Sequence, residues 1–325
     1  MEKEIKLKKT FTAPFLVAIV YILLTASGFI DLHDLEKSDD NIYLSVIILQ
    51  MVIFLLPGIV YCKLAKPSQY PKELRIKGIG GRKTVFTISA FFVMFFGSNL
   101  LKLGLFSVEK LIRGMSPNFK SYMLYSEYVP TSSATVKNII YIFVALSILP
   151  AVTEEFVFRG ILLNEYKHAG SGIGTAMFMS SLMFAMLHFD LAQLPVYFFC
   201  GMMTAAAYYV TGSLVSAVII HTLNNAVSMF FENNIFLLMG QSENTIFFIF
   251  MMTALFMISL MIAFGSAEKI FYKMGIMGEP TRFLREKRFK KNENGKFTEA
   301  ILSPSFLLCL LIYIANITLR LLGKI

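Results

Sequence analysis

The chain has 325 residues, of which 56% are hydrophobic and 16% are charged, and it carries a formal net charge of +9 at pH 7. Soluble globular domains carry about 25% charged residues, whereas this chain repeats apolar runs of about twenty residues between short polar segments. A soluble fold is therefore excluded. Barrel strands would alternate in polarity over about ten residues, and that pattern is absent. We expect an all-α, polytopic transmembrane helical bundle.

The apolar runs predict about eight to nine transmembrane helices, since about twenty helical residues cross a bilayer core. The first run follows four lysines and no cleavage site of small residues is evident after it, so we expect an uncleaved signal anchor. The run at 138–153 is the shortest, and its helix could extend to about Tyr166. The expected spans are 11–30, 42–62, 84–106, 138–153, 172–189, 192–211, 213–231, 245–265 and 302–319.

Basic residues gather in alternate segments between the spans. The N-terminal tail, 63–83 and 266–301 are rich in Lys and Arg, whereas 31–41 and 232–244 are not. The exception is 107–137, which has four basic residues although it is assigned outside, and in a loop of this length the charge bias counts for less. Because basic loops stay in the cytoplasm, we expect a cytoplasmic N-terminus, and the Lys-, Ile- and Phe-rich composition is typical of a bacterial plasma-membrane protein. The positive charge suits anionic lipid. No basic patch lies on a soluble domain, so we expect no nucleic-acid partner.

Ionisable side chains within spans mark function because they are costly at membrane depth. Glu154 and Glu155 are adjacent, so on a helix they diverge by about 100°. Glu155 and Arg159 have the i,i+4 spacing of an ion pair, which leaves Glu154 as the freer carboxylate. Pro150, four residues earlier, should kink the helix. The alternative is an interfacial cluster that merely ends a span.

Two histidines and an asparagine lie on the following spans. His188 is near the end of an apolar helix, where it could instead snorkel to the interface beside Asp190. His221 is near the middle of its span and Asn225 is one turn later. The alternative for this pair is a hydrogen bond that joins helices. Lys102, near the end of the third span, is expected to snorkel.

Taken together, these side chains supply the roles that peptide hydrolysis needs. Glu154 and His188 are a base and a second titratable group, and His221 and Asn225 are donors for an oxyanion. Glu154, His188 and His221 could also hold a zinc ion with an open position for water. The sequence contains neither a G-x-S-x-G nor an H-E-x-x-H motif.

Three short patterns follow one another in the chain: Glu154-Glu155-x-x-x-Arg159, Phe184-x-x-x-His188 and His221-x-x-x-Asn225. This ordered set resembles the three motifs of the CPBP family, the CAAX prenyl endopeptidases and their bacterial relatives, also called Abi proteins. The order matches, as do the intervals of 34 and 33 residues between Glu154, His188 and His221. The resemblance covers about 138–231.

The resemblance implies an intramembrane endopeptidase in which Glu154 activates water with help from His188. His221 and Asn225 would steady the oxyanion, while Glu155 and Arg159 would support the site by fixing the helix. The family is described both as metalloproteases and as glutamate proteases, so zinc stays open. We accordingly divide the chain into N-terminal transmembrane helices (1–137), a catalytic core (138–231) and C-terminal transmembrane helices with a basic cytoplasmic loop (232–325).

The expected partners are the lipid bilayer and a membrane-associated peptide or protein substrate, which would enter a polar cavity from the cytoplasm or laterally from lipid. The sequence predicts no oligomeric state. One alternative is a non-catalytic membrane scaffold or bacteriocin-immunity protein. Another is a transporter with a Glu and His proton relay, but such transporters contain repeated halves and this chain shows no repeat.

Overall fold

The computed structural model describes residues 11–28, 39–64, 75–113, 136–240, 245–276 and 293–322. All regular structure in these ranges is helical, which confirms the expected all-α class. Six helices are long and apolar enough to cross a membrane, and three further apolar helices are shorter. The protein is therefore a polytopic helical membrane protein. Each expected span coincides with one of these nine helices. Ala13–Ser27 and Ile173–Met186 are shorter than a full crossing requires, whereas Leu214–Phe230 is the first part of a helix that continues to Gly240.

Several α-helices are continued by π-helical turns (η). The elements in chain order are α1 (Ala13–Ser27), α2 (Asp39–Gln50), η2 (Met51–Leu55), α3 (Leu56–Leu64), α4 (Arg82–Arg113), α5 (Val136–Phe143), η4 (Val144–Ile148), α6 (Leu149–Glu155), η5 (Phe156–Leu163), α7 (Asn164–His168), α8 (Ile173–Met186), α9 (Leu194–Thr211), α10 (Leu214–Gly240), α11 (Thr245–Ile276), α13 (Glu293–Ile301) and α14 (Pro304–Leu321).

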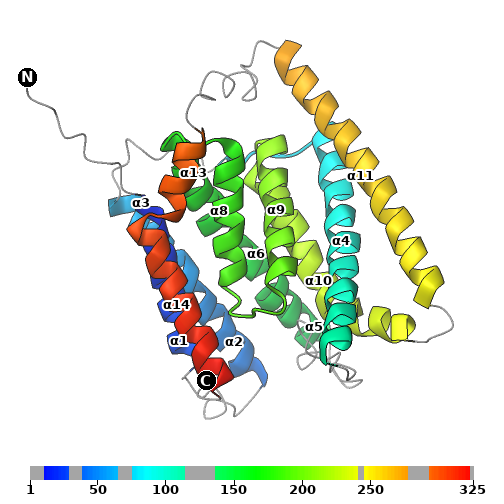
Figure 1. The fold of residues 1–325 in the computed structure, drawn as a ribbon, viewed down its shortest axis with the longest axis horizontal. Coiled ribbons are helices and arrows are strands. Elements are labelled where there is room, and N and C mark those ends of the chain that lie inside the picture. The colour runs from blue at the N-terminus through cyan, green and yellow to red at the C-terminus, as the bar shows by residue number, and fades with distance from the viewer. Residues whose placement is uncertain are drawn as a thin grey trace, which may run out of the picture.

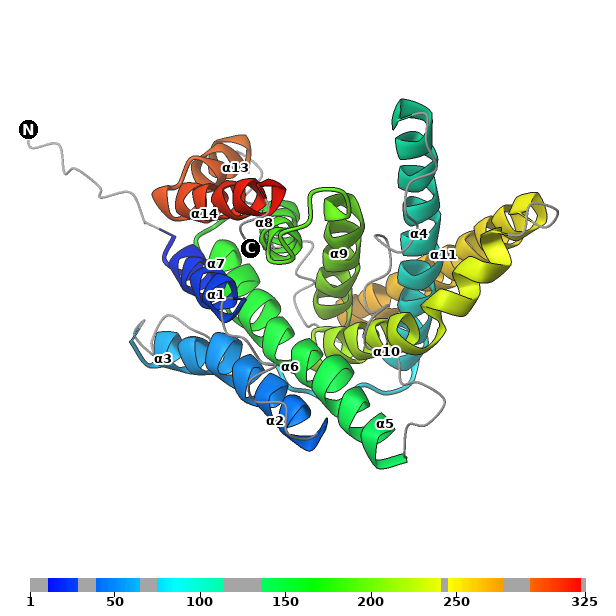
Figure 2. The same cartoon turned by 90° about the horizontal axis from the view of Figure 1, so that it is seen from below.

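Helices α8, α9 and α10 stand at the centre of the bundle (Figure 1). The pair α1 and α14 packs on one flank and the pair α4 and α11 on the other, with α4 also against α9 and α10. Seen from below, the long helix formed by α5, α6 and α7 runs between α2–α3 and α10 (Figure 2). The site described below lies where this helix meets α10.

The helix that carries the two glutamates is longer than expected. Residues 136–168 form one helix, so the span limit at 153 and the loop expected at 154–171 are wrong. The structure agrees instead with the alternative from the sequence, a helix that extends from the span to about Tyr166. Pro150 does not end the helix: it is the second residue of α6 and follows the π-turn Val144–Ile148, after which the Leu149 amide donates to the Val144 carbonyl. Single π-turns within helices are frequent at functional sites.

Other helices also run past their expected ends. α4 continues to Arg113, α10 to Gly240 and α11 to Ile276, while α13 lies within the expected basic loop. Hydropathy marks where apolar residues end, but a helix can project from the bilayer into polar sequence, so the loop limits at 107–137, 232–244 and 266–301 were too wide. Most of the basic stretch 282–296 lies outside the described residues.

A single carboxylate joins three helices near one end of the bundle. Glu165 of α7 accepts hydrogen bonds from the backbone amide of Ala13 at 2.9 Å and from the Tyr61 hydroxyl of α3 at 2.6 Å. The Thr12 amide, which precedes α1, also donates to it. A carboxylate at a helix N-terminus satisfies free amides and interacts favourably with the helix dipole. This contact fixes α1 and α3 to the helix that carries the site.

Candidate active site

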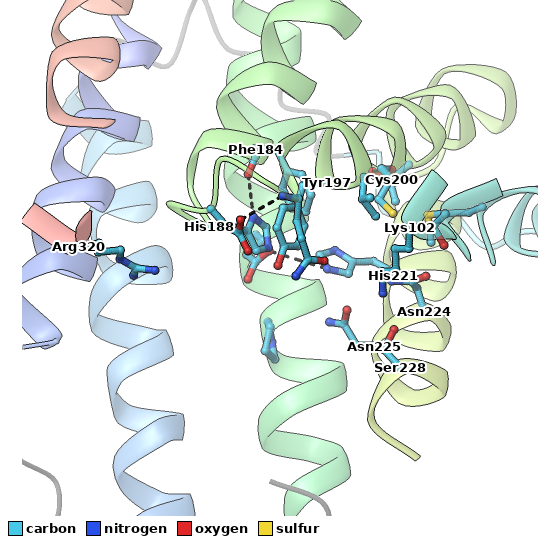
Figure 3. A pocket seen from close by; sticks show the side chains of 18 residues that line it. Lys102, Phe184, His188, Tyr197, Cys200, His221, Asn224, Asn225, Ser228 and Arg320 are labelled. Atoms are coloured by element: carbon cyan, nitrogen blue, oxygen red, sulfur yellow. Dashed lines mark hydrogen bonds and ion pairs between the residues drawn. The ribbon is translucent and has the colours of Figure 1, made fainter. Parts of the chain in front are cut away.

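A polar cavity of about 410 Å³ opens among the central helices (Figure 3). Residues of α4, α6, α8, α9, α10 and α14 and of the turn between α8 and α9 form its wall. They are Met94, Ser98, Lys102, Pro150, Glu154, Phe184, His188, Asp190, Gln193, Val196, Tyr197, Cys200, Thr204, His221, Asn224, Asn225, Ser228 and Arg320. Four residues that the sequence singles out, Glu154, His188, His221 and Asn225, therefore share one cavity although they come from three separate segments.

The two adjacent glutamates contact the two nitrogens of one imidazole. Glu154 Oε2 lies 3.9 Å from His221 Nε2, and Glu155 Oε1 lies 2.9 Å from His221 Nδ1. The side chains do diverge, as helix geometry predicts, but His221 lies between them. Because an ionised carboxylate only accepts hydrogen bonds, Nδ1 donates to Glu155, and Nε2 is the nitrogen that faces Glu154 and the cavity.

Behind the cavity wall, Glu155 forms the ion pair that its spacing from Arg159 predicts. Arg159 Nη1 lies 3.0 Å from Glu155 Oε1, and both side chains are completely buried. Arg159 Nη2 donates to the carbonyl of Gly201 at 2.8 Å, and the guanidinium carbon lies 4.8 Å from the Phe184 ring centroid. Arg159 thereby ties α9 and the end of α8 to the helix of the glutamates, while Glu155 makes the contact with His221 of α10.

The close approach at Gly201 depends on the lack of a side chain. A Cβ atom there would lie 3.1 Å from the Cα of Ser181 on α8, which is tighter than packed side chains normally allow. The small residue lets α9 lie directly against α8, so that its carbonyl reaches Arg159. Sequence reasoning did not single out this glycine.

His188 follows the last turn of α8 and is fixed by two contacts. Its Nδ1 lies 3.2 Å from the carbonyl oxygen of Phe184, and its ring stacks on Tyr197 with centroids 3.7 Å apart. A carbonyl oxygen only accepts, so Nδ1 carries the proton and Nε2 is the acceptor in the neutral ring. The chain then reverses at Phe189, whose φ of 47° is unusual for an aromatic residue. Asp190 does not pair with His188 at an interface; its Oδ1 accepts from the Gln193 amide at 3.0 Å.

The expected role of Lys102 is wrong. Its side chain is only 4% exposed and lines the cavity, whereas snorkelling would carry the ammonium to the interface. The helix continues for eleven residues beyond it, to Arg113, so it is not at a helix end. Met94, Ser98 and Lys102 follow one another at i,i+4 spacing, and this one-sided pattern was the signal that sequence reasoning missed.

The geometry bears on whether the cavity could hold zinc. Zinc binds nitrogen or oxygen ligands at about 2.0–2.2 Å, or thiolate sulfur at about 2.3 Å, in a tetrahedral arrangement. In the described part of the chain, no three His, Cys, Asp or Glu side chains are grouped in a way that could hold a metal ion. The ligand set Glu154, His188 and His221 therefore does not fit zinc as these side chains are arranged, and we derive the chemistry from the side chains alone.

Comparison with known proteins gives an independent assignment. Residues 136–227 match the family model of type II CAAX prenyl endopeptidase Rce1-like proteins. The chain is also 27% identical over 233 residues to the membrane-embedded CAAX protease MroQ of Staphylococcus aureus (strain USA300), covering 68% of this chain and 89% of that protein. No solved structure matches the chain significantly. The matched region contains all three motifs and most of the cavity wall.

Proposed function

Because the chain belongs to the CPBP family of CAAX prenyl endopeptidases, we propose that it is an intramembrane endopeptidase that hydrolyses peptide bonds of membrane-associated peptides or proteins. One observation carries the proposal: a carboxylate and two imidazoles face a common cavity of about 410 Å³. Ionisable groups within membrane-spanning segments are costly and are retained for function. A cavity of this size admits a stretch of peptide together with water.

In this mechanism Glu154 is the base that activates water. Its carboxylate accepts a proton while the water oxygen attacks the carbonyl carbon of the scissile bond. His188 assists, because Nδ1 donates to the Phe184 carbonyl and Nε2 is left to accept a hydrogen bond from the same water. Stacking on Tyr197 holds the ring in this orientation. The step forms a carbon–oxygen bond and leaves a negative charge on the substrate oxygen.

His221 and Asn225 stabilise that charge. Glu155 accepts the Nδ1 proton of His221 at 2.9 Å, so Nε2 is the nitrogen that faces the cavity, where a proton on Nε2 would donate to the oxyanion. The Asn225 amide, one helical turn later, is the second donor. Collapse of the intermediate breaks the carbon–nitrogen bond, and Glu154 returns its proton to the departing amine. Glu155 and Arg159 act by positioning His221 and the helix, and neither lines the cavity.

The direct test is cleavage by the purified protein. In detergent, the wild-type chain is expected to cleave members of a quenched fluorescent peptide library, and the Glu154→Ala/His221→Ala double variant is expected to cleave none. Activity that survives in the double variant, or a wild type that cleaves nothing in detergent and in proteoliposomes, would contradict the proposal. Exhaustive chelation distinguishes the two mechanisms, since the metal-free mechanism predicts unchanged rates, whereas loss that zinc restores would require a metalloprotease.

The proposal extends to orientation in a bacterial plasma membrane. The end of α3 with Lys63, the start of α4 with Arg82, and the end of α11 with Lys273 lie at one end of the bundle, the upper end in Figure 1. Basic ends face the cytoplasm. The turn between α8 and α9 lies at the lower ends of these two helices in Figure 1, away from the basic ends, and contributes His188 and Asp190 to the cavity. In this orientation the turn faces the external side, whereas from the sequence we expect a cavity that opens toward the cytoplasm or laterally to lipid.

Thiol labelling tests this orientation. In a chain whose cysteines at 62, 200 and 309 are replaced, Leu191→Cys is placed on the α8–α9 turn, where Leu191 is 61% exposed. Gly80→Cys is the matched control at the basic end, where a side chain meets no neighbour. A membrane-impermeant maleimide is expected to label Leu191→Cys on intact cells, and Gly80→Cys only after permeabilisation. The opposite pattern would reverse the orientation.

A further inference from the structure

Phe189, the residue after His188, has a backbone conformation that residues with a side chain rarely adopt. Its φ is 47°, and among the described residues only Arg75 shares a positive φ without being a glycine. For a bulky residue this left-handed conformation is a true outlier, because the Cβ atom crowds the following carbonyl oxygen. Such strain persists only where the surrounding structure holds it, and it concentrates at functional sites.

The left-handed residue closes a short connection at the cavity. The Phe189 amide donates to the Met186 carbonyl at 3.1 Å, and α9 begins five residues later at Leu194. The first turn of α9 then brings in Tyr197, whose ring centroid lies 3.7 Å from that of His188. The direction of the chain at Phe189 therefore governs how the Tyr197 ring lies over His188.

The Phe189 ring is held by helices that carry no motif. The residue is 3% exposed, and its ring centroid lies 5.6 Å from that of Tyr21 on α1, edge to face, and 6.2 Å from that of Tyr313 on α14, stacked. The Arg320 guanidinium carbon, also on α14, lies 5.8 Å from the same centroid, and Figure 3 shows Arg320 on the His188 side of the cavity. Aromatic pairs and a cation over a ring are favourable beyond the burial of their surface, so these contacts offset the strain.

Glycine is the usual residue at a left-handed position that ends a helix, because it has no Cβ atom. A phenylalanine at this position gives up an unstrained backbone for a buried ring. The ring ties the backbone beside His188 to α1 and α14, which lie outside the residues 136–227 that match the family model. The hydrolytic mechanism described above assigns no role to this contact.

We propose that Phe189 is a positioning residue, through which α1 and α14 hold His188 in its catalytic orientation. The inference rests on the proposed peptidase function, in which His188 helps Glu154 to activate water. Phe189 does not line the cavity, so it acts only through its neighbour. When the ring is lost, the strained turn relaxes and the stack on Tyr197 loosens, and the Nε2 atom of His188 is no longer held toward the water.

Replacement of Phe189 by alanine and by glycine separates the backbone from the ring. Both variants lose the ring contacts, but alanine keeps the Cβ atom that makes a positive φ costly, whereas glycine adopts this φ freely. In cleavage of a quenched peptide by the full-length protein in detergent, Phe189→Ala is expected to lower kcat about tenfold and to leave KM within about twofold. Phe189→Gly should keep a kcat at least about threefold higher than that of Phe189→Ala. A residue that only fills space predicts the opposite order, because glycine leaves the larger void.

Combination with His188→Ala shows whether the effect passes through the histidine. Two residues that act on the same step have non-additive effects. In a His188→Ala background, Phe189→Ala should change kcat less than about twofold. Tyr313→Leu, which removes the stacked ring of α14, should lower kcat about threefold at unchanged KM, and only when His188 is present.

Chemical modification of the histidines reports on their position without any cleavage. Diethyl pyrocarbonate acylates imidazole nitrogens, and mass mapping of the digested protein resolves each histidine. Phe189→Ala should raise the modification rate of His188 several-fold, because the ring leaves its stack on Tyr197. The rate at His221, on α10, should stay unchanged and is the internal reference for any general opening of the cavity.

Phe178→Leu is the matched control. Phe178 is an aromatic residue of the same helix as His188, and it packs on Phe198 and Phe297. The variant should change neither kcat nor the modification of His188, whatever its effect on stability.

Three outcomes would overturn the inference: a wild-type kcat in Phe189→Ala, a loss of kcat that is equal with and without His188, or a larger loss in Phe189→Gly than in Phe189→Ala. If Phe189→Ala does not fold, Phe189→Gly and Tyr313→Leu carry the same comparison with His188→Ala. Failure of the peptidase proposal looks different, because the wild-type protein would then cleave nothing, while the modification rates would still show whether Phe189 holds His188.

Discussion

Replacement of Glu154 by glutamine is expected to lower kcat/KM for peptide cleavage by about a thousandfold. Glutamine keeps the size of the side chain but cannot accept a proton from water. Glu154 is 8% exposed and lines the cavity, and its closest ionic partner described is His221 Nε2 at 3.9 Å, so folding should be little affected. The measurement is initial-rate cleavage of a quenched peptide by purified wild-type and variant protein, with thermal unfolding as the check on folding.

Glu268→Gln is the matched control, because Glu268 is exposed on α11, away from the cavity, and its loss should leave rates unchanged. If Glu154→Gln cleaves at more than a tenth of the wild-type rate, Glu154 is not the base. A cellular phenotype that persists in the variant despite lost cleavage would favour the scaffold or immunity function over the enzyme.

Removal of the buried cation by Arg159→Met should have the largest effect on stability. It would leave Glu155 in a completely buried position without its ion-pair partner, which typically costs about 3–5 kcal/mol. It also removes the hydrogen bond to the Gly201 carbonyl. We expect an unfolding midpoint about 10 °C lower. A thiol-reactive dye in detergent can report this, because Cys309 is buried and becomes reactive on unfolding.

The double variant Glu155→Gln/Arg159→Met separates charge from packing. With both charges removed, part of the lost stability should return, whereas activity should stay low because Glu155 no longer holds His221 by its Nδ1. Arg82→Met, at an exposed position at the start of α4, controls for loss of a surface arginine. A midpoint for Arg159→Met within about 2 °C of the wild type would show that the pair contributes little.

The sequence predicted the helices because hydropathy directly reflects residence in lipid. It predicted their ends poorly because a helix that leaves the bilayer keeps its backbone hydrogen bonds while its side chains become polar, as at the end of α4. The π-turn at Phe156–Leu163 was also beyond prediction. Its residues differ in no obvious way from those of an ordinary apolar helix.

The sequence predicted those contacts of the site that join residues one helical turn apart. The pair Glu155 and Arg159 is one turn apart, and the expected contact is present at 3.0 Å. The contact of Glu155 with His221 joins residues 66 positions apart, and nothing in the sequence indicates which of the two glutamates takes which nitrogen. Tyr197 was missed for the same reason, since the approach of α9 to the end of α8 is a property of the packed bundle.

The contact that Glu165 makes with Tyr61 and the start of α1 limits how far the matched region 136–227 can be treated as an autonomous unit. A fragment with those boundaries would leave the Glu165 carboxylate without the donors that it now satisfies. It would also lack the α4 face of the cavity, which supplies Lys102. The region that carries the motifs is therefore not a module that could be transplanted, and its catalytic geometry depends on helices in which no motif is found.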